Sequence, residues 1–191
     1  VDNIHSPYGV VTVVCEGDNM PKLNGSNYVT YNPAEYELKE VLENGGNMTL
    51  TSDLTLTKDF NVPAGTNATI DLDGNTLTVK STNSVRGNLA IDNGDVVIDV
   101  DGSGDVNVAF AAYNGSTVDL SGANIQVADK SAAVYVPKNG EAVINVDNTT
   151  MTVGNGGHGI FVPQGAKDLK INFTNSIITG SPYALYLMQT N

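Results

Sequence analysis

The sequence contains no tryptophan, one cysteine and one arginine among its 191 residues. Because Cys15 is alone, no disulfide can form within the chain, and a zinc site is disfavoured. Only nine lysines and arginines stand against 21 aspartates and glutamates, which gives a formal charge of −12. Phosphate binding needs clustered cations, so this balance argues against nucleic acid as a partner. No apolar run approaches the roughly 18 residues of a membrane span, so we expect no membrane insertion.

Helical patterning is also scarce, and only one segment shows it. Between Ala34 and Glu43 the apolar residues Leu38, Val41 and Leu42 fall on one face, and Asn44-Gly45-Gly46 ends the pattern. A helix this short is marginal alone and must dock its apolar stripe on another element.

Residues 1–33 differ from the remainder of the chain. They hold two short β-like runs, Val10–Cys15 and Tyr28–Tyr31, separated by a stretch rich in glycine, asparagine and proline. We therefore expect residues 1–33 to be a lead-in or small β subdomain, and residues 34–191 to form the helix and the main domain.

Internal repeats dominate the main domain, where apolar residues alternate with period two from Met48 onward. Five segments superpose at spacings of 28, 20, 26 and 27 residues: Ile70-Asp71-Leu72, Ile98-Asp99-Val100, Val118-Asp119-Leu120, Ile144-Asn145-Val146 and Ile171-Asn172-Phe173. A second apolar pair follows each of them: Leu77/Val79, Val106/Val108, Ile125/Val127, Met151/Val153 and Ile178 with Gly180. A third strand closes each unit: Leu89/Ile91, Ala109/Ala111, Val134/Val136, Ile160/Val162 and Leu185/Leu187.

Such units carry too few inward residues to form a core alone, so they must stack on one another. Three strands per repeat predict an all-β fold, a right-handed parallel β-helix of about five to six rungs with a short N-terminal capping helix. In this fold Val118, Ile144 and Ile171 lie directly above one another. A doubly wound α/β fold would need helices between the strands, and none fits the pattern.

The run from Asn44 to Val79, NGGNMTLTSDLTLTKDFNVPAGTNATIDLDGNTLTV, resembles the first turns of pectin-lyase-like β-helix proteins. The preceding helix is similar to the N-terminal cap that such proteins often carry. The resemblance implies the fold over about residues 34–191. It does not decide the activity, because the class includes polysaccharide lyases and hydrolases, bacterial surface proteins, and phage fibre or tailspike proteins.

The outward positions of two strand faces predict ordinary solvated surfaces. The first expected column is Asp71, Asp99, Asp119, Asn145 and Asn172, and the second is Thr78, Asn107, Gln126, Thr152 and Thr179. Stacked asparagines and threonines can hydrogen-bond along such columns. Although aspartates stacked in the first column could bind a hard cation, its charge is lost at Asn145, so we expect a solvated acidic edge and no metal site.

The outward column of the third face differs, because its last members are aromatic. It is expected to contain Asn61, Ala90, Phe110, Tyr135, Phe161 and Tyr186. The four aromatic residues are spaced 25, 26 and 25 residues apart, which matches the coil period. We interpret Phe110, Tyr135, Phe161 and Tyr186 as contacts for a subunit or for carbohydrate. Two other interpretations remain: residues 1–33 cover the column, or the rings point inward.

The segment Gly156-Gly157-His158-Gly159 resembles the Gly-His-Gly segment of polygalacturonase-type hydrolases. Those enzymes also carry an Asn-Thr-Asp segment, adjacent aspartates and an Arg-x-Lys motif, which this sequence lacks. Without the acid and base carboxylates, we interpret the segment as a glycine-rich turn. We therefore expect no catalytic residues and no cofactor.

The chain stops at Gln189-Thr190-Asn191, just after an apolar strand. An uncapped strand edge needs a cover, so we expect the natural protein to continue or another chain to lie there. These features favour a non-catalytic structural or adhesive protein of an extracellular location, on a virion or bacterial cell surface. It would be a homo-oligomer, a trimer by resemblance to phage fibres, or bind other structural subunits or cell-surface polysaccharide. The alternative is a polysaccharide lyase or hydrolase, or a carbohydrate-binding relative.

Overall fold

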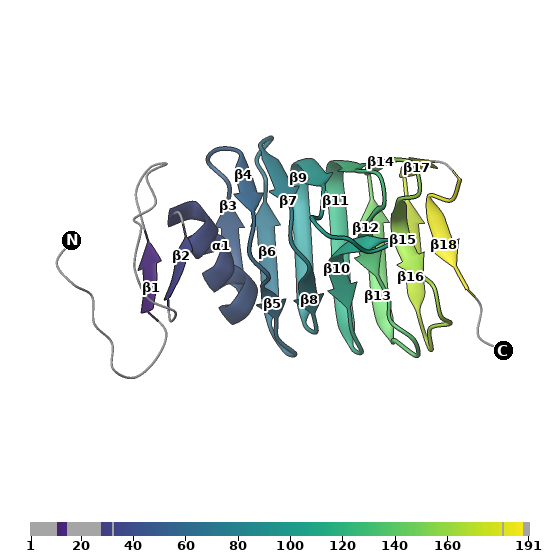
Figure 1. Ribbon diagram of the computed structural model, residues 1–191, viewed down its shortest axis with the longest axis horizontal. Coiled ribbons are helices and arrows are strands. Elements are labelled where there is room, and N and C mark those ends of the chain that lie inside the picture. Colours follow the sequence, from purple (N-terminus) through teal and green to yellow (C-terminus); the bar gives the residue numbers. More distant parts are fainter. Residues whose placement is uncertain (1–10, 15–27, 32, 181, 189–191) are drawn as a thin grey trace.

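The computed structural model describes residues 11–14, 28–31, 33–180 and 182–188. Parallel strands stack there as a β-solenoid of about five turns, with one short helix at the N-terminal side. The coils follow one another along the long axis from the N-terminal to the C-terminal end (Figure 1). The predicted parallel β-helix with a short N-terminal capping helix is confirmed.

The first and second faces of the solenoid belong to one ten-stranded sheet, because two long strands run through both of them. The first face contains β3 (Gly46–Thr49), β6 (Asn67–Asp71), the first halves of β9 (Asn88–Ile98) and β11 (Ser116–Val127), β13 (Ala142–Asp147) and β16 (Lys170–Thr174). The second face contains β4 (Leu54–Leu56), β7 (Thr76–Val79), the second halves of β9 and β11, β14 (Thr150–Val153) and β17 (Ile177–Gly180).

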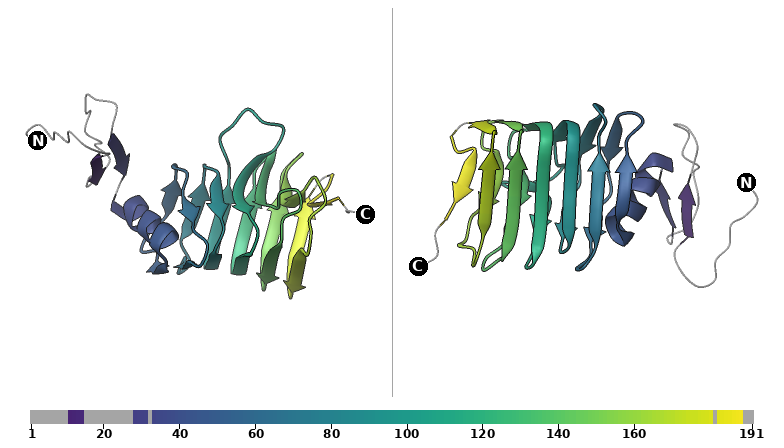
Figure 2. Two further views of the ribbon diagram at one scale, coloured as in Figure 1. Left: turned by 90° about the horizontal axis from the view of Figure 1, so that it is seen from below. Right: turned by 180° about the vertical axis from the view of Figure 1, so that it is seen from behind.

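A separate six-stranded sheet forms the third face. Its strands are β5 (Asn61–Val62), β8 (Asn83–Val85), β10 (Asn107–Ala112), β12 (Ser131–Tyr135), β15 (His158–Val162) and β18 (Leu185–Leu187). Figure 2 shows the coils from below and from behind, and the long loop between β9 and β10 stands out from the solenoid in the left view.

The predicted core stacking is confirmed in the second half of the chain. Val118 pairs with Ile144, and Ile144 pairs with Ile171, so the three residues lie one above another in successive coils. Val118 and Ile144 are 0 % exposed, whereas Ile171 belongs to the last coil and is half-buried. Burial of such columns by the neighbouring coils supplies the main hydrophobic stabilisation of the fold.

The helix α1 (Pro33–Asn44) covers the N-terminal end of the solenoid, as predicted, with each end one residue beyond the predicted boundary. Leu38 and Leu42 are buried against the first coils. Glu35 is buried too, and its Oε1 accepts hydrogen bonds from the backbone N and the hydroxyl of Thr57, both at 2.8 Å. Gly45, at φ 83°, ends the helix in the left-handed region that glycine adopts most easily.

The N-terminal residues form a small sheet of their own, in line with the two predicted β runs. β1 (Val11–Val14) and β2 (Tyr28–Tyr31) pair in parallel. Both lie beyond α1, at the opposite end of the molecule from β15 and β18 (Figure 1). These strands therefore do not cover the aromatic column, and Cys15 lies outside the described residues.

The predicted repeat is wrong in the second coil. Leu89 and Ile91 lie on the first face, beside Val118 and Leu120, and not on the third. Ile98 pairs with Val79 and Val127 on the second face. Consequently Ile70 aligns with Ile91 and Leu120, not with Ile98 or Val118, and Val106 and Val108 do not belong to the second face.

A buried amide explains part of this error, because the third-face strand of that coil is short and partly polar. Asn83 in β8 is 2 % exposed and points into the core, at the position that Phe110 and Val134 occupy in the next two coils. Its Oδ1 accepts a hydrogen bond from the backbone N of Phe60 at 3.0 Å, and its Nδ2 donates to the Ala109 carbonyl at 3.2 Å. The amide thus links the preceding and the following coils.

Single left-handed residues make the corner between the first and second faces, which explains the rest of the error. Asn93, Gly122, Asn148 and Asn175 have φ values of 60°, 58°, 47° and 48°. At Asn148 and Asn175 only two residues separate the strand of the first face from that of the second. At Asn93 and Gly122 the strands β9 and β11 bend through the corner without interruption. Asparagine and glycine tolerate this conformation best.

We expect Val118→Ala to lower the free energy of unfolding by about 2 kcal/mol, because it removes two fully buried methyl groups and leaves a cavity. Val143→Ala is the matched control, since Val143 lies on the same face but is only half-buried. It should cost less than about 1 kcal/mol. Urea unfolding followed by circular dichroism measures both values, and equal losses would contradict the assigned core.

Candidate functional site

Aromatic rings gather on the outside of the third sheet toward its C-terminal end. We use the name aromatic surface for Tyr135 of β12, His158 and Phe161 of β15, and Tyr183 and Tyr186 in or just before β18. The ring centroids of Tyr135 and Phe161 are 6.0 Å apart, and those of Phe161 and Tyr186 are 5.4 Å apart. Three of the four predicted contact residues, Tyr135, Phe161 and Tyr186, thus form one column as expected.

Phe110 does not belong to this column. It pairs with Val134 and is 3 % exposed, and its neighbour Ala111 is the residue aligned with Tyr135. The reason is that Ala109 and Phe110 are consecutive and both join the hydrophobic core, so strict alternation fails within β10. Ala90 is also misplaced in the prediction, because it lies on the first face and Ser84 takes the place next to Asn61.

A similar break in alternation, in β15, brings His158 into the aromatic surface. The ring of His158 stacks on that of Phe161 at a centroid distance of 4.7 Å and an interplanar angle of 4°. Three residues of regular strand would place them on opposite sides, but Gly159 and Ile160 both point inward between them. A Cβ at residue 159 would meet the side-chain ends of Met151 and Ile178, so a larger residue there would force those two side chains to shift.

His158 is 7 % exposed, and its Nδ1 lies 2.7 Å from the Tyr183 carbonyl oxygen. Among the described residues, its other contacts are with the rings of Phe161 and Tyr186, and none of its hydrogen bonds is to a carboxylate. His158 therefore lies in a strand, β15, and not in the predicted glycine-rich turn, and the coil period does not place either His158 or Tyr183 in the aromatic surface. The glycines on both sides of His158 are the sequence feature that could indicate this position, because glycines within a strand often mark a break in the regular alternation of inward and outward residues.

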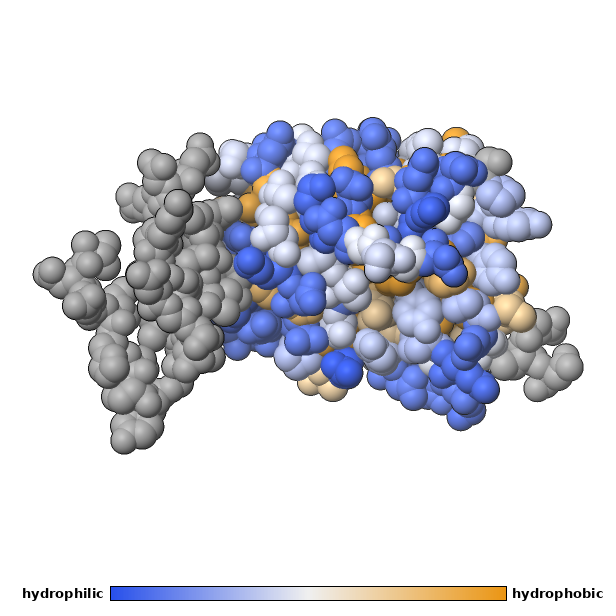
Figure 3. Space-filling model, viewed as in Figure 1, coloured by the Kyte–Doolittle hydropathy of each residue, from blue (hydrophilic) through white to orange (hydrophobic). Residues whose placement is uncertain are grey.

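Hydrophilic residues dominate the side of the molecule shown in Figure 3, and apolar residues show between them. The last coil is more apolar at its surface. Phe173, Ile177, Leu187 and Met188 are each between 39 % and 62 % exposed. A hollow of about 400 Å³ beside them is lined by Val162, Leu169, Ile171 and Leu187, among others. The described part of the chain therefore leaves both a strand edge and apolar side chains accessible at this end.

The first predicted polar column is correct in the later coils only. Asn172 donates a hydrogen bond to Asn145 at 2.7 Å, and Asn145 donates to Asp119. Asp71 belongs to a neighbouring column of the first face, and Asp99 follows the second-face end of β9. On the second face every predicted member but one aligns as expected, and Val97 occupies the place assigned to Asn107. The aligned residues are Thr78, Gln126, Thr152 and Thr179.

Three carboxylates come close together on the first face. The pKa of Asp92 is raised above its ordinary value of 3.8, chiefly because the carboxyl is partly buried. The negative charges of Asp71 and Asp119 raise this pKa further. No group of three or more histidines, cysteines, aspartates or glutamates in the described residues is arranged to hold a metal ion. Within the same part of the chain, no helix is long and apolar enough to cross a membrane.

The fold and surface define a class, the parallel β-solenoids with an N-terminal helical cap. Comparisons with known proteins go no further: no family model, no curated protein and no solved structure matches this chain.

We expect Asp92→Asn to stabilise the protein at pH 7. A raised pKa in the folded state means that folding favours the protonated carboxyl, so this group destabilises the fold once pH rises through that pKa. The advantage of the variant should disappear as pH falls below about 4, where the wild-type carboxyl is protonated in both states.

Urea unfolding between pH 3 and pH 8 measures this difference. Asp147→Asn is the matched control, because Asp147 is an exposed carboxylate on the same face whose strand partners are Ser121 and Thr174. A gain that is equal at pH 3 and pH 8, or equal in the control, would contradict repulsion among Asp71, Asp92 and Asp119.

Proposed function

We propose that this protein is a non-catalytic structural or adhesive module of the pectin-lyase-like β-helix type, displayed on an outer surface. A phage fibre or decoration component, or a bacterial surface module, would meet this description. The observation that carries the proposal is the aromatic surface, in which Tyr135, Phe161 and Tyr186 follow one another on neighbouring coils. Its first partner is a second copy of the chain, with a homotrimer as the expected assembly.

The composition of the aromatic surface supports a protein contact. Tyrosine and phenylalanine are enriched at protein interfaces, where they provide large contact areas with few rotatable bonds. The rings of Phe161, His158 and Tyr186 already pack on one another, so little side-chain entropy remains to be lost on binding. Tyr183, 59 % exposed at the edge of the surface, provides additional area for a partner.

The contacts of His158 weigh against the alternative, a polysaccharide lyase or hydrolase. A glycosidase uses two carboxylic acids that flank the scissile bond. Within the described part of the chain, His158 contacts aromatic rings and one backbone carbonyl, so its imidazole is engaged in packing. This supports a role for the Gly-His-Gly segment in shaping the aromatic surface.

The net charge sets a condition on self-association. Copies that each carry a formal charge of −12 repel one another, and salt screens this repulsion. An interface built from stacked rings gains little from charge pairing. Association should therefore strengthen as salt is raised from low to physiological concentration.

We expect the double variant Tyr135→Ser with Tyr186→Ser to weaken self-association by roughly tenfold or more, since truncating an aromatic anchor commonly costs above 1 kcal/mol. Sedimentation velocity over a concentration series, at low and physiological salt, measures the effect. Tyr113→Ser is the matched control, because Tyr113 lies outside the aromatic surface. Its ring packs on Arg86, whose Cζ lies 4.6 Å from the ring centroid.

Three results would contradict the proposed contact. The first is a wild-type chain that stays monomeric at every concentration. The second is an equal loss of association in the Tyr113 control. The third is association that survives the double variant but is lost in Ile177→Ser, which would place the contact at the last coil.

A further inference from the structure

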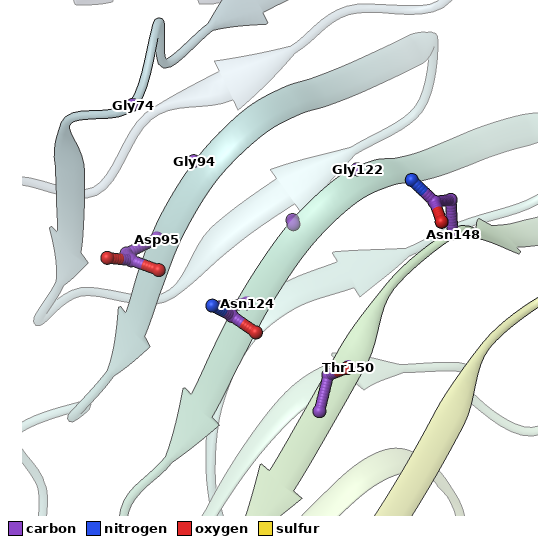
Figure 4. Close-up of a pocket in the computed structure, with 8 residues that line it drawn as sticks. Gly74, Gly94, Asp95, Gly122, Asn124, Asn148 and Thr150 are labelled. Atoms are coloured by element: carbon purple, nitrogen blue, oxygen red, sulfur yellow. The ribbon is translucent and has the colours of Figure 1, made fainter.

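A shallow groove follows the corner between the first and second faces. Figure 4 shows that it crosses neighbouring coils, with Gly74, Gly94 and Gly122 along one side. Its volume is about 250 Å³. This corner lies across the solenoid from the third sheet, so the groove is separate from the aromatic surface.

Backbone geometry creates this groove. A Cβ at residue 94 would collide with Leu72 and with the Asn75 carbonyl, so only glycine fits there. Gly122 adopts φ 58° to turn the corner, and Gly74 adopts φ 79°. Because steric contacts impose glycine at residue 94 and positive φ values favour it at residues 74 and 122, the groove is pre-formed and needs no rearrangement to accept a ligand.

Polar side chains line the other side of the groove at regular intervals. Asp95, Asn124 and Thr150 pair in successive coils of the second face, about 4.8 Å apart, and all three are exposed. They point outward, because the residues that follow them, Val96, Ile125 and Met151, are buried. Asn148 joins them at the corner (Figure 4).

These side chains differ from the other polar columns in their hydrogen bonding. On the first face, Asp119, Asn145 and Asn172 bond to one another. Among the described residues, the carboxylate of Asp95, the amide of Asn124 and the hydroxyl of Thr150 have no such side-chain bonds. A row of donors and acceptors is thus left for an external molecule.

We propose that this corner groove binds a neutral, hydroxyl-rich oligosaccharide that lies along the solenoid axis. Sugar hydroxyls both donate and accept hydrogen bonds, as the mixed amide, hydroxyl and carboxylate groups require. The one charged group of the groove, Asp95, is negative and disfavours uronic acids, sulfated sugars and phosphates. The lining is too polar for an apolar peptide.

This inference goes beyond the proposed self-association, and each can fail without the other. The test uses the ¹⁵N-labelled full chain titrated with cellotriose, chitotriose and mannotriose as neutral probes, and with trigalacturonic acid as the charged counterpart. We expect at least one neutral probe to give saturable amide shifts at Gly94, Gly122 and Asn124. The charged probe should bind at least fivefold more weakly than that neutral probe.

Variants then locate the site. Asn124→Ala combined with Thr150→Ala should lower the affinity for the bound neutral probe at least fivefold. The matched control is Gln126→Ala combined with Thr152→Ala, because these residues lie two positions further along the same strands and also face outward. Asn124→Ser is a second, milder variant that should weaken binding to a smaller extent. Circular dichroism confirms that each variant is folded.

The proposal is overturned if none of the three neutral probes shifts these amides. It is equally overturned if trigalacturonic acid binds more tightly, or if the control variant loses as much affinity as the groove variant. Shifts confined to Tyr135, Phe161 and Tyr186 would assign sugar binding to the aromatic surface and not to the corner groove.

Discussion

Burial of each coil by its neighbours is the constraint on which the rest of this structure depends. A single coil offers one or two inward residues per strand and cannot exclude water alone. Only when Val118, Ile144 and their equivalents lie in columns are they covered above and below. The same stacking pairs the backbone of each strand with the next coil, so hydrophobic burial and hydrogen bonding require the same register.

This constraint explains which parts of the fold could be predicted. In the coils from β11 onward, each strand carries a regular apolar pair and the repeat length is nearly constant, so the columns were identified correctly. In the second coil the corner at Asn93 replaces a loop, and Asn83 replaces an apolar residue. Both features remove the signal on which an alternating pattern relies, and the strands were assigned to the wrong faces.

The candidate sites show a related limit. The aromatic column was found because Tyr135, Phe161 and Tyr186 recur at the coil period. The position of His158 could not be predicted because Gly159 and Ile160 both face inward. A pattern that alternates every two residues assigns consecutive residues to opposite sides of the strand. The corner groove was not foreseen at all, since it is defined by the absence of side chains at Gly74, Gly94 and Gly122. Whether these glycines leave a hollow depends on how the coils stack.

Asn83 bears on a hazard that all repetitive chains share. Coils of similar sequence can stack in the wrong order at little cost in apolar burial. The amide of Asn83 bonds to Phe60 in the coil before and to Ala109 in the coil after, so its hydrogen bonds favour the native order of coils. A coil order that removes the Phe60 partner would leave the buried Oδ1 of Asn83 without its hydrogen bond, at a cost of about 1–3 kcal/mol. One polar side chain in the interior thus discriminates between the native order of coils and its closest competitors.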